Sequence, residues 1–545
     1  LHGIINVLTP AAGNSSDNSL AIEAGANDFL RLRARLSGPP EKPFQASFII
    51  ADDGGFRDAS GYRQGKLQLQ GNWSFADAGT LKTVFTATDL DQETAGFIFG
   101  EDAYKDPLLN RGNLNPEAFR QATSQRLYGI WQRSLASVDI DVRPFVRHSD
   151  MRFLHHFLPG QPLEENGHAS VGALLSASFD ANSARVTTGA DIEWSDMFLK
   201  ETQFGPTEGS DFLVETRPPG KHYDYEVASR SIAPYLQADI DWTDRLTLSA
   251  GLRLEYVHYD YDNRMLAGNT RDDGTPCGFS GCLYSRPASG SDSFTNVAPK
   301  LGASLRLTED TRLFGNLARG FRAPQTTELY RLQNGQQVAS LESESIDSVE
   351  LGIRLRKPRW SADIAVFAMR KRDSVLRDSD GFNISGGRSR HEGIELAFDW
   401  RLLDTLRFKL NSSYARHVYD FDLVAARGET FVSGNDVDTA PRWLGSAELL
   451  FEPGNGFDAS LLWTAIGDYY LDAENRYTYP GHDLVNLRAG FELSPRFTIS
   501  ARLNNALDTD YADRADFAFG AYRYFPGRGR ELFVELQYLP NAVGN

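Results

Sequence analysis

The side chains best suited to bind a ligand lie in one polar stretch and in the residues just after it. This stretch, Gly320 to Gln333, follows an alternating segment, Arg312 to Ala318, and contains Gly and Pro as strand breakers. An arginine guanidinium is a planar fork that suits carboxylate or catecholate oxygens, and phenol and amide groups donate further hydrogen bonds. The candidate ligand-binding residues of this region are Arg322, Tyr330, Arg331, Gln333 and Gln337.

Two segments rich in tyrosine and aspartate supply further candidates. Tyr223 to Glu226 is predicted to be a loop, and Tyr256 to Asn263 the top of a strand. Aromatic rings combine a large contact area with a polar handle, which suits an aromatic or sugar-like ligand. A rigid aromatic collar on extended hairpins would have the same composition, so both interpretations stay open. The candidates chosen here are Tyr223, Tyr225 and Tyr259.

The two cysteines, Cys277 and Cys282, are separated by four residues and have Gly and Pro around them. A zinc site would need two more ligands than this pair supplies. We therefore favour a local disulfide that pins a loop, which implies an oxidising compartment.

One group of histidines is weighed as a metal site. His155 and His156 are adjacent, and His168 follows them. Adjacent side chains on a strand point to opposite faces, so the first two cannot chelate one ion together. Glu164 and Glu165, with His168, are interpreted more simply as part of a solvated loop. We therefore predict no metal site and no bound cofactor.

Composition and motifs exclude several classes of protein. The chain has 545 residues, a formal net charge of −17 and a mean hydropathy of −0.40, with no run of 18 apolar residues. Such acidity argues against nucleic-acid binding, and a membrane-spanning helix is not predicted. No Gly-x-Ser-x-Gly elbow, His-Glu-x-x-His pair or phosphate loop occurs, so an enzyme is not expected. A hydrolase with Ser and His on the outer wall of a barrel stays open as an alternative.

Alternation with a period of two dominates the chain and predicts strands with one apolar and one polar face. About 22 such segments occur, and the gaps between them are alternately short and long, as in outer-membrane barrels. Alternating segments include Leu30–Leu36, Val138–Arg143, Leu236–Trp242, Leu246–Tyr256, Val349–Leu355, Val485–Phe491 and Leu532–Tyr538, and long gaps include Ser149–Glu165, Glu201–Ala228, Tyr261–Ser293, Arg319–Glu344 and Lys371–Arg390. The predicted fold is an all-β, 22-stranded antiparallel transmembrane barrel with short periplasmic turns and long extracellular loops.

Three motifs, in order along the chain, resemble segments of TonB-dependent outer-membrane receptors. Leu1 to Pro10 is similar to the end of the plug domain that precedes the first barrel strand. Arg319 to Pro324, followed by Glu328 to Tyr330, resembles the mid-barrel signature. Leu503 to Tyr511 resembles the Asn-rich motif before the last strand, and Tyr524 to Arg528 follows it. Together with the strand pattern, the resemblance covers essentially the whole chain.

The resemblance implies a domain organisation and a cellular location. Residues 1–10 would be the residual end of a plug and residues 11–545 the barrel, in the outer membrane of a Gram-negative bacterium and surrounded by its lipid. Most of the plug and the box that contacts TonB are missing, and Leu1 is not a start methionine. We therefore expect a mature fragment or an excised domain, and we assign transport to the parent protein.

The resemblance also implies a function, namely TonB-energised import of a scarce small molecule. Ferric siderophores or related iron complexes are the first expectation, because they are the commonest substrates of the family. Uptake of a carbohydrate or another small molecule is the alternative, and a passive porin is a further one. The partners implied are the TonB complex, reached through the missing plug and coupling box, and the substrate.

A haem substrate is disfavoured by the residues after the mid-barrel motif. Haem receptors of this family carry a similar Phe-Arg-Ala-Pro box, a histidine after it and an Asn-Pro-Asn-Leu box. Here no histidine lies between Arg322 and His391, and no second box follows.

The favoured pairing of the cysteines gives a direct test. Mass spectrometry of the exported protein under non-reducing conditions is expected to find Cys277 linked to Cys282. Two free thiols would contradict this prediction.

Overall fold

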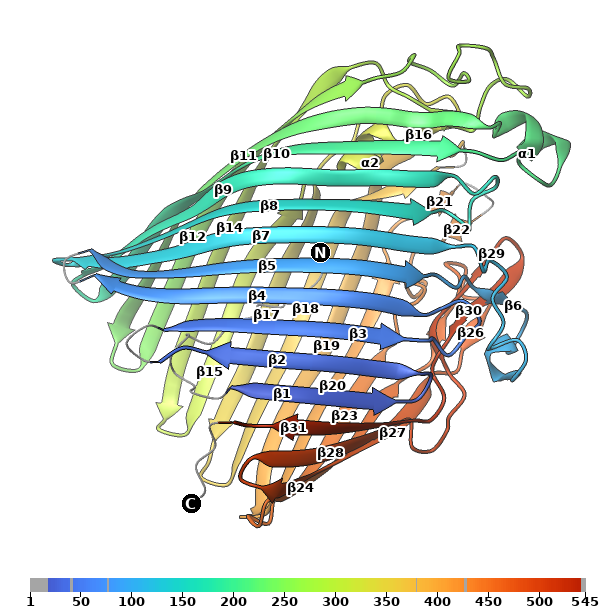
Figure 1. Ribbon diagram of the computed structural model, residues 1–545. Coiled ribbons are helices and arrows are strands. Elements are labelled where there is room, and N and C mark those ends of the chain that lie inside the picture. Colours follow the sequence, from blue (N-terminus) through green and yellow to red (C-terminus); the bar gives the residue numbers. More distant parts are fainter. Residues whose placement is uncertain (1–17, 40–42, 76–77, 379, 426–428, 541–545) are drawn as a thin grey trace.

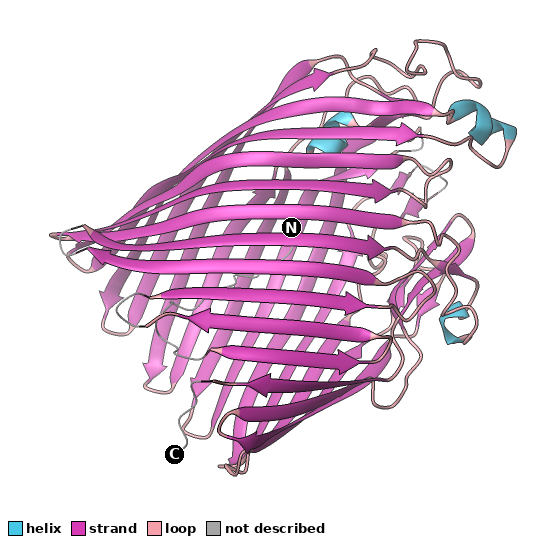
Figure 2. Cartoon of the chain, in the orientation of Figure 1, coloured by secondary structure: helices cyan, strands magenta, loops and turns pink. Residues whose placement is uncertain are grey.

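Strands in which apolar and polar residues alternate form one closed barrel. The computed structural model describes residues 18–39, 43–75, 78–378, 380–425 and 429–540. Within this part of the chain, 22 strands form one antiparallel sheet, and the first, β1 (Ser19–Gly25), pairs with the last, β31 (Glu531–Tyr538) (Figures 1 and 2). The predicted fold class is therefore confirmed. The predicted plug remnant, Leu1 to Pro10, lies outside the described residues.

The strands between these two follow one another around the wall in chain order. Those of the first half are β2 (Phe29–Ser37), β3 (Phe44–Asp53), β4 (Tyr62–Phe75), β5 (Gly79–Glu93), β7 (Phe119–Leu135), β8 (Val138–Leu154), β9 (Leu163–Ala181), β10 (Ala184–Gln203), β11 (Gly220–Thr243) and β12 (Leu246–Asn263). Those of the second half are β14 (Gly290–Thr308), β15 (Thr311–Arg322), β17 (Glu344–Arg356), β18 (Trp360–Arg377), β19 (Asn383–Leu403), β20 (Leu406–Tyr419), β23 (Trp443–Phe451), β24 (Phe457–Ile466), β27 (His482–Ser494) and β28 (Phe497–Asn504).

The long loops at one end of the barrel carry the remaining short elements (Figure 1). Among the described residues these are the strands β6 (Ile98–Phe99), β13 (Tyr284–Ser285), β16 (Leu332–Gln333), β21 (Leu423–Val424), β22 (Thr430–Phe431), β25 (Tyr469–Tyr470), β26 (Thr478–Tyr479), β29 (Ala512–Ala518) and β30 (Ala521–Pro526), and the helices η1 (Ala103–Lys105), α1 (Asp211–Thr216) and α2 (Thr326–Tyr330). Within the described ranges, no helix is long and apolar enough to cross a membrane.

Many strands are longer than the alternation predicts. Tyr223 to Glu226, predicted to be a loop, belongs to β11 and pairs with β10 and β12. A strand of about 10 residues crosses a bilayer, whereas β11 has 24 residues and β10 has 20. The excess length projects beyond the membrane, where neither face contacts lipid and the alternation of apolar and polar residues fades.

Inside the membrane, the two faces of the wall differ as the alternation predicts. On β17, the side chains of Val349 and Leu351 are 38% and 59% exposed on the outer face. Glu350 and Arg354, of the opposite parity, line a cavity on the lumen side together with residues of β18 to β24. The outer face can therefore meet lipid while the charged face meets the interior.

A charge placed on the outer face tests this orientation. Leu351→Arg is expected to lower the free energy of unfolding by about 2–4 kcal/mol, because an arginine near the bilayer midplane loses its water. Urea titration of the protein in lipid vesicles measures this loss. Ser446→Arg, which adds the same group beside the lumen cavity, is the matched control with a small expected effect. Equal losses for the two variants would contradict the assignment of faces.

Candidate ligand-binding site at the barrel mouth

The predicted ligand stretch folds back onto the inner wall of the barrel. It begins at the end of β15, and α2 follows with a capping box in which the Gln325 and Glu328 side chains bond each other's backbone N–H groups. Arg322 donates to both carboxylate oxygens of Glu328, each at 3.0 Å, and to Glu344 at 3.0 Å. These bonds tie the start of the stretch to β17, and they use the planar fork of Arg322 within the protein itself.

Three of the predicted tyrosines, including Tyr330 of this stretch, are buried in one cluster. Tyr223, Tyr225 and Tyr330 are 2%, 3% and 4% exposed. Tyr330 stacks on Tyr261 with ring centroids 4.1 Å apart, and its hydroxyl donates to Asp292 at 2.8 Å. Burial raises the pKa of these three phenols, so they stay protonated and carry no charge at neutral pH. The structure therefore places them in an aromatic collar, one of the two arrangements left open by composition.

Arg331 holds the stretch to the wall through buried charges. Its guanidinium pairs with Glu164 at 3.1 Å and with Glu201, which is fully buried at the end of β10. Glu201 also accepts from His222 at 3.0 Å and from Arg217 at 3.3 Å. Burial opposes the charge of Glu201, yet Arg331, His222 and Arg217 outweigh it and hold the pKa of this carboxyl well below its usual range.

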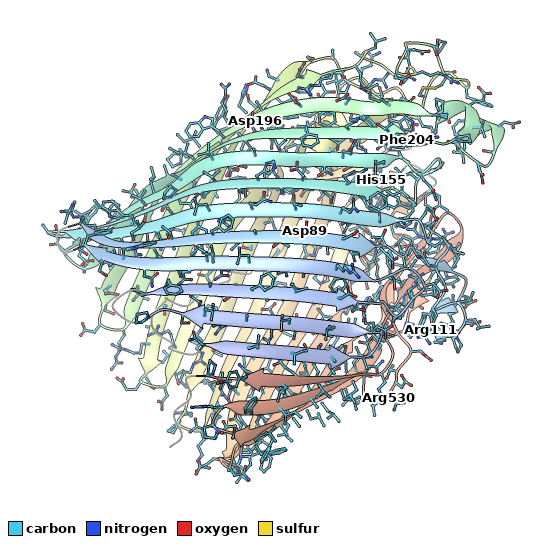
Figure 3. All side chains as sticks on the ribbon, viewed as in Figure 1. Asp89, Arg111, His155, Asp196, Phe204 and Arg530 are labelled. Carbon is cyan, nitrogen blue, oxygen red and sulfur yellow. A yellow bond between two sulfur atoms is a disulfide. The ribbon has the colours of Figure 1, made fainter. Side chains whose placement is uncertain are left out.

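Glu164 corrects one expectation drawn from the sequence. It was assigned to a solvated loop, but it lies in β9 with 7% exposure and bonds His155 at 2.7 Å. Potential ligand atoms of His155, Glu164 and Glu201 lie within 4.8 Å of one another, a spacing that a metal ion could use. The guanidinium of Arg331 already pairs with both carboxylates and supplies the positive charge there. His155 itself follows the end of β8, at the end of the barrel that carries the long loops (Figure 3).

The other two histidines of the predicted set lie apart from this cluster. His156 is in the turn after β8, so the expected strand geometry of the His155 and His156 pair does not apply. His168 is in β9 and bonds the Ser149 hydroxyl at 2.9 Å.

A cavity of about 1150 Å³ opens between the loops in front of Arg331. Of the predicted residues, Arg331 and Gln333 line it, whereas Gln337 is exposed outside it and Tyr259 is half-buried against Phe294. Gln333 accepts from Arg377 at 2.8 Å. The lining side chains that the sequence did not suggest include Phe97, His155, Phe157, Phe212, Arg217, Arg377, Phe519 and Arg523.

These missed residues come from loops and from strands at the mouth that are spread along most of the chain; Arg377 ends β18 and Arg523 lies in β30. Arg523 shows how they converge, since it lies over the Phe97 ring at 4.4 Å and bonds Asp516 at 2.5 Å. Phe519, in the turn between β29 and β30, also contacts Arg523, whose guanidinium lies 5.6 Å from the centre of the ring. No local pattern marks such residues, because only the closed barrel brings the loops together.

The two cysteines form a disulfide in the loop between β12 and β14, with an S–S distance of 1.95 Å. Cys277 and Cys282 are buried in the same cluster as the collar tyrosines. The disulfide therefore stiffens one of the loops that pack behind the candidate site.

Comparison with known proteins identifies the class of protein that this barrel represents. The family model described as TonB dependent receptor-like, beta-barrel matches residues 13–506. The chain belongs to this family of TonB-dependent receptors, so the resemblance found in the sequence is confirmed. Its members are transport receptors, and the family and the 22-stranded barrel place the protein in the outer membrane of a Gram-negative bacterium.

Individual relatives are distant. The rhizobactin receptor of Rhizobium meliloti is 22% identical over 616 residues, covering 98% of this chain and 79% of that receptor. The metal-pseudopaline receptor CntO of Pseudomonas aeruginosa is 22% identical over 316 residues, covering 56% of this chain, and the match spans only 40% of that receptor's length. The ferric-catecholate import receptor Fiu of Escherichia coli has the same fold, with a TM-score of 0.77 at 14% identity over 97% of this chain and 82% of that one.

Removing the central cation tests the buried network. Arg331→Met leaves Glu201 and Glu164 short of a partner, which is expected to cost about 3–5 kcal/mol of local stability. Hydrogen exchange of residues 329–341 at neutral pH should be correspondingly faster. Because the pKa of Glu201 is depressed in the wild type, the network is complete above the ordinary carboxyl pKa of about 4.3 and weakens as the pH falls below it.

The pH dependence separates loss of the ion pair from loss of packing. In Arg331→Met, the unpaired carboxylate is neutralised in acid, so the difference from wild type should be larger at pH 7 than at pH 4. Val338→Ala, an exposed change in the same loop, should exchange like wild type. A difference that does not vary with pH would contradict the electrostatic role of Arg331.

Proposed function

We propose that this barrel belongs to an outer-membrane receptor that imports a ferric siderophore or a related metal complex with energy from TonB. The observation that carries the proposal is the family match over residues 13–506. Relatives named as the metal-pseudopaline receptor and the rhizobactin receptor support the substrate class. Coupling to TonB would pass through a plug and its coupling box in the complete receptor, which would carry out no chemical reaction on the substrate.

The mouth cavity has a size and a lining that suit such a ligand. Its volume of about 1150 Å³ is slightly above the usual range of small-molecule sites, about 300–1,000 Å³. Aromatic rings from several loops offer apolar contact area, and Arg331, Arg377 and Arg523 bring guanidinium groups to the same space. Planar cations beside aromatic rings favour anionic, planar groups such as catecholates and carboxylates over neutral sugars.

The arginines of this cavity are paired with acidic groups, Arg331 with Glu164 and Glu201 and Arg523 with Asp516, so they offer guanidinium N–H groups rather than a net positive field. The net charge of −17 would repel an anionic complex at long range. Binding would therefore depend on short-range contacts inside the mouth, where Arg331 retains 20% exposure of its side chain. This arrangement favours the metal-complex proposal over the alternative of carbohydrate uptake.

Uptake in cells tests the proposal. A deletion strain is expected to lose iron-limited growth on one class of ferric siderophore among catecholate, hydroxamate and carboxylate types, and to lose uptake of the radioactive iron complex. The full-length wild-type receptor should restore both. Arg523→Met should weaken uptake at low substrate concentration, whereas Leu108→Ala, an exposed change outside the cavity lining, should not.

Unchanged growth and uptake in the deletion strain for every ferric siderophore, with no induction by iron starvation, would contradict the proposal. Loss of growth on a carbohydrate in the same strain would favour the alternative substrate class.

A further inference from the structure

Three potential metal donors lie side by side on the inner face of the wall formed by β18, β19 and β20. In the strand register, Met369 is opposite His391, and His391 is opposite His417 (Figure 1 shows the three strands). On each strand, a residue an odd number of positions from the donor is exposed on the outer, lipid-facing side. These residues are Val366, Ile394 and Tyr414, with 48%, 45% and 52% exposure. Because side chains alternate between faces, all three donors face the lumen.

The imidazole rings of His391 and His417 face each other through their Nδ1 atoms. Nδ1 of His391 lies 2.7 Å from Nδ1 of His417. Metal–imidazole bonds are about 2.0–2.1 Å long, so this spacing corresponds to an N–metal–N angle of about 80°. An angle of 90° needs a separation of about 2.9 Å, and a tetrahedral angle needs about 3.3 Å. A small increase in the distance between the two Nδ1 atoms would therefore suit an ion with tetragonal coordination much better than one with tetrahedral coordination.

Hydrogen bonding orients the first imidazole for this role. Nε2 of His391 lies 2.9 Å from the Ser389 hydroxyl, which is 9% exposed. When Nε2–H donates to Ser389, Nδ1 keeps its lone pair, as metal-bound histidines require. The proton between the rings then belongs to His417. If a metal ion replaces it, this proton moves to Nε2 of His417 through water, and binding releases no net proton.

Two charged groups of the described residues that act on the histidines, Lys371 and Asp436, are already paired. Lys371, on the same face of β18, is held by Glu344 at 3.3 Å. Asp436, the acidic group that acts on His417, pairs with Arg416 and Arg442. Among the described residues, the acidic groups near the pair are thus engaged in ion pairs, and a donor set of nitrogen and sulfur suits copper and disfavours hard ions such as Fe³⁺ or Mg²⁺.

We propose that His391 and His417 form a copper site on the lumen wall, with Met369 as a neighbouring thioether donor. The two Nδ1 atoms would hold Cu²⁺ in a tetragonal arrangement whose remaining positions are filled by water. Met369 is one of only four methionines in the chain, and a thioether beside two imidazoles would extend the site to Cu⁺. This site does not rest on the proposed uptake of a ferric complex, because it uses other residues and another class of ion.

Copper titration of the metal-free, full-length receptor in detergent tests the site, with copper sulfate as the probe. The expected electron paramagnetic resonance spectrum is a tetragonal Cu²⁺ signal with splitting from two nitrogens at one ion per protein. The double variant with His391→Ala and His417→Ala should lose this signal. Ser389→Ala should weaken binding about tenfold, because it removes the group that orients His391.

His168→Ala is the matched control. The His168 ring also bonds a serine hydroxyl, but that bond uses its Nδ1 atom, whereas Nδ1 of His391 faces a second histidine. This control should bind copper like wild type, and both histidine variants should keep the heat-dependent gel migration of a folded barrel. In competition, affinity should fall from Cu²⁺ to Ni²⁺ to Zn²⁺. A folded double variant that keeps the two-nitrogen signal, or Zn²⁺ that competes equally with Cu²⁺, would overturn the proposal.

Discussion

Hydrogen bonding between β1 and β31 is the constraint on which the rest of the structure depends. These strands pair antiparallel from Leu20 with Tyr538 to Gly25 with Phe533. A bilayer offers no water to an unpaired strand edge, so a sheet within it must close on itself. Once it closes, side chains of one parity face lipid and those of the other face an enclosed interior. Both the charged lumen and the gathering of loops at one end follow from this closure.

The loops at the mouth are held by buried charges rather than by apolar packing alone. Arg331 pairs with Glu164 and Glu201 at the ends of two wall strands. Such buried ion pairs contribute little net stability, because the desolvation of each ion offsets most of the attraction. They do select one arrangement, since any other leaves a carboxylate buried without a partner. The network thus fixes the stretch that carries α2 and leaves one edge of Arg331 facing the cavity.

The period of two was enough to predict the strands and the closed barrel, because lipid on one face and a polar interior on the other impose it directly. It underestimated the strands that project beyond the membrane, where this contrast ends, as Tyr223 and Tyr225 in β11 show. Residue type identified Arg331 and Gln333 in the cavity lining. It could not distinguish Tyr330, buried in the collar, from a ligand-facing tyrosine, because both roles use the same ring and hydroxyl.

Other residues of the mouth cavity could not be predicted from short sequence patterns. Phe97 and Arg523 meet only because β6 pairs with β30 across the closed barrel. The pair of His391 and His417 is different, since the hairpin of β19 and β20 sets its register. Counting outward from that turn reaches the pair only when one residue is allowed for the β-bulge between Arg401 and Leu403.

The most direct test of the account is a structure of the full-length receptor bound to the ferric complex that it imports. The complex is predicted to occupy the mouth cavity, with its anionic groups in contact with Arg331, Arg377 or Arg523 and its organic part against Phe97 or Phe519. A saturated complex that contacts none of these residues would contradict the central claim that this cavity is the binding site.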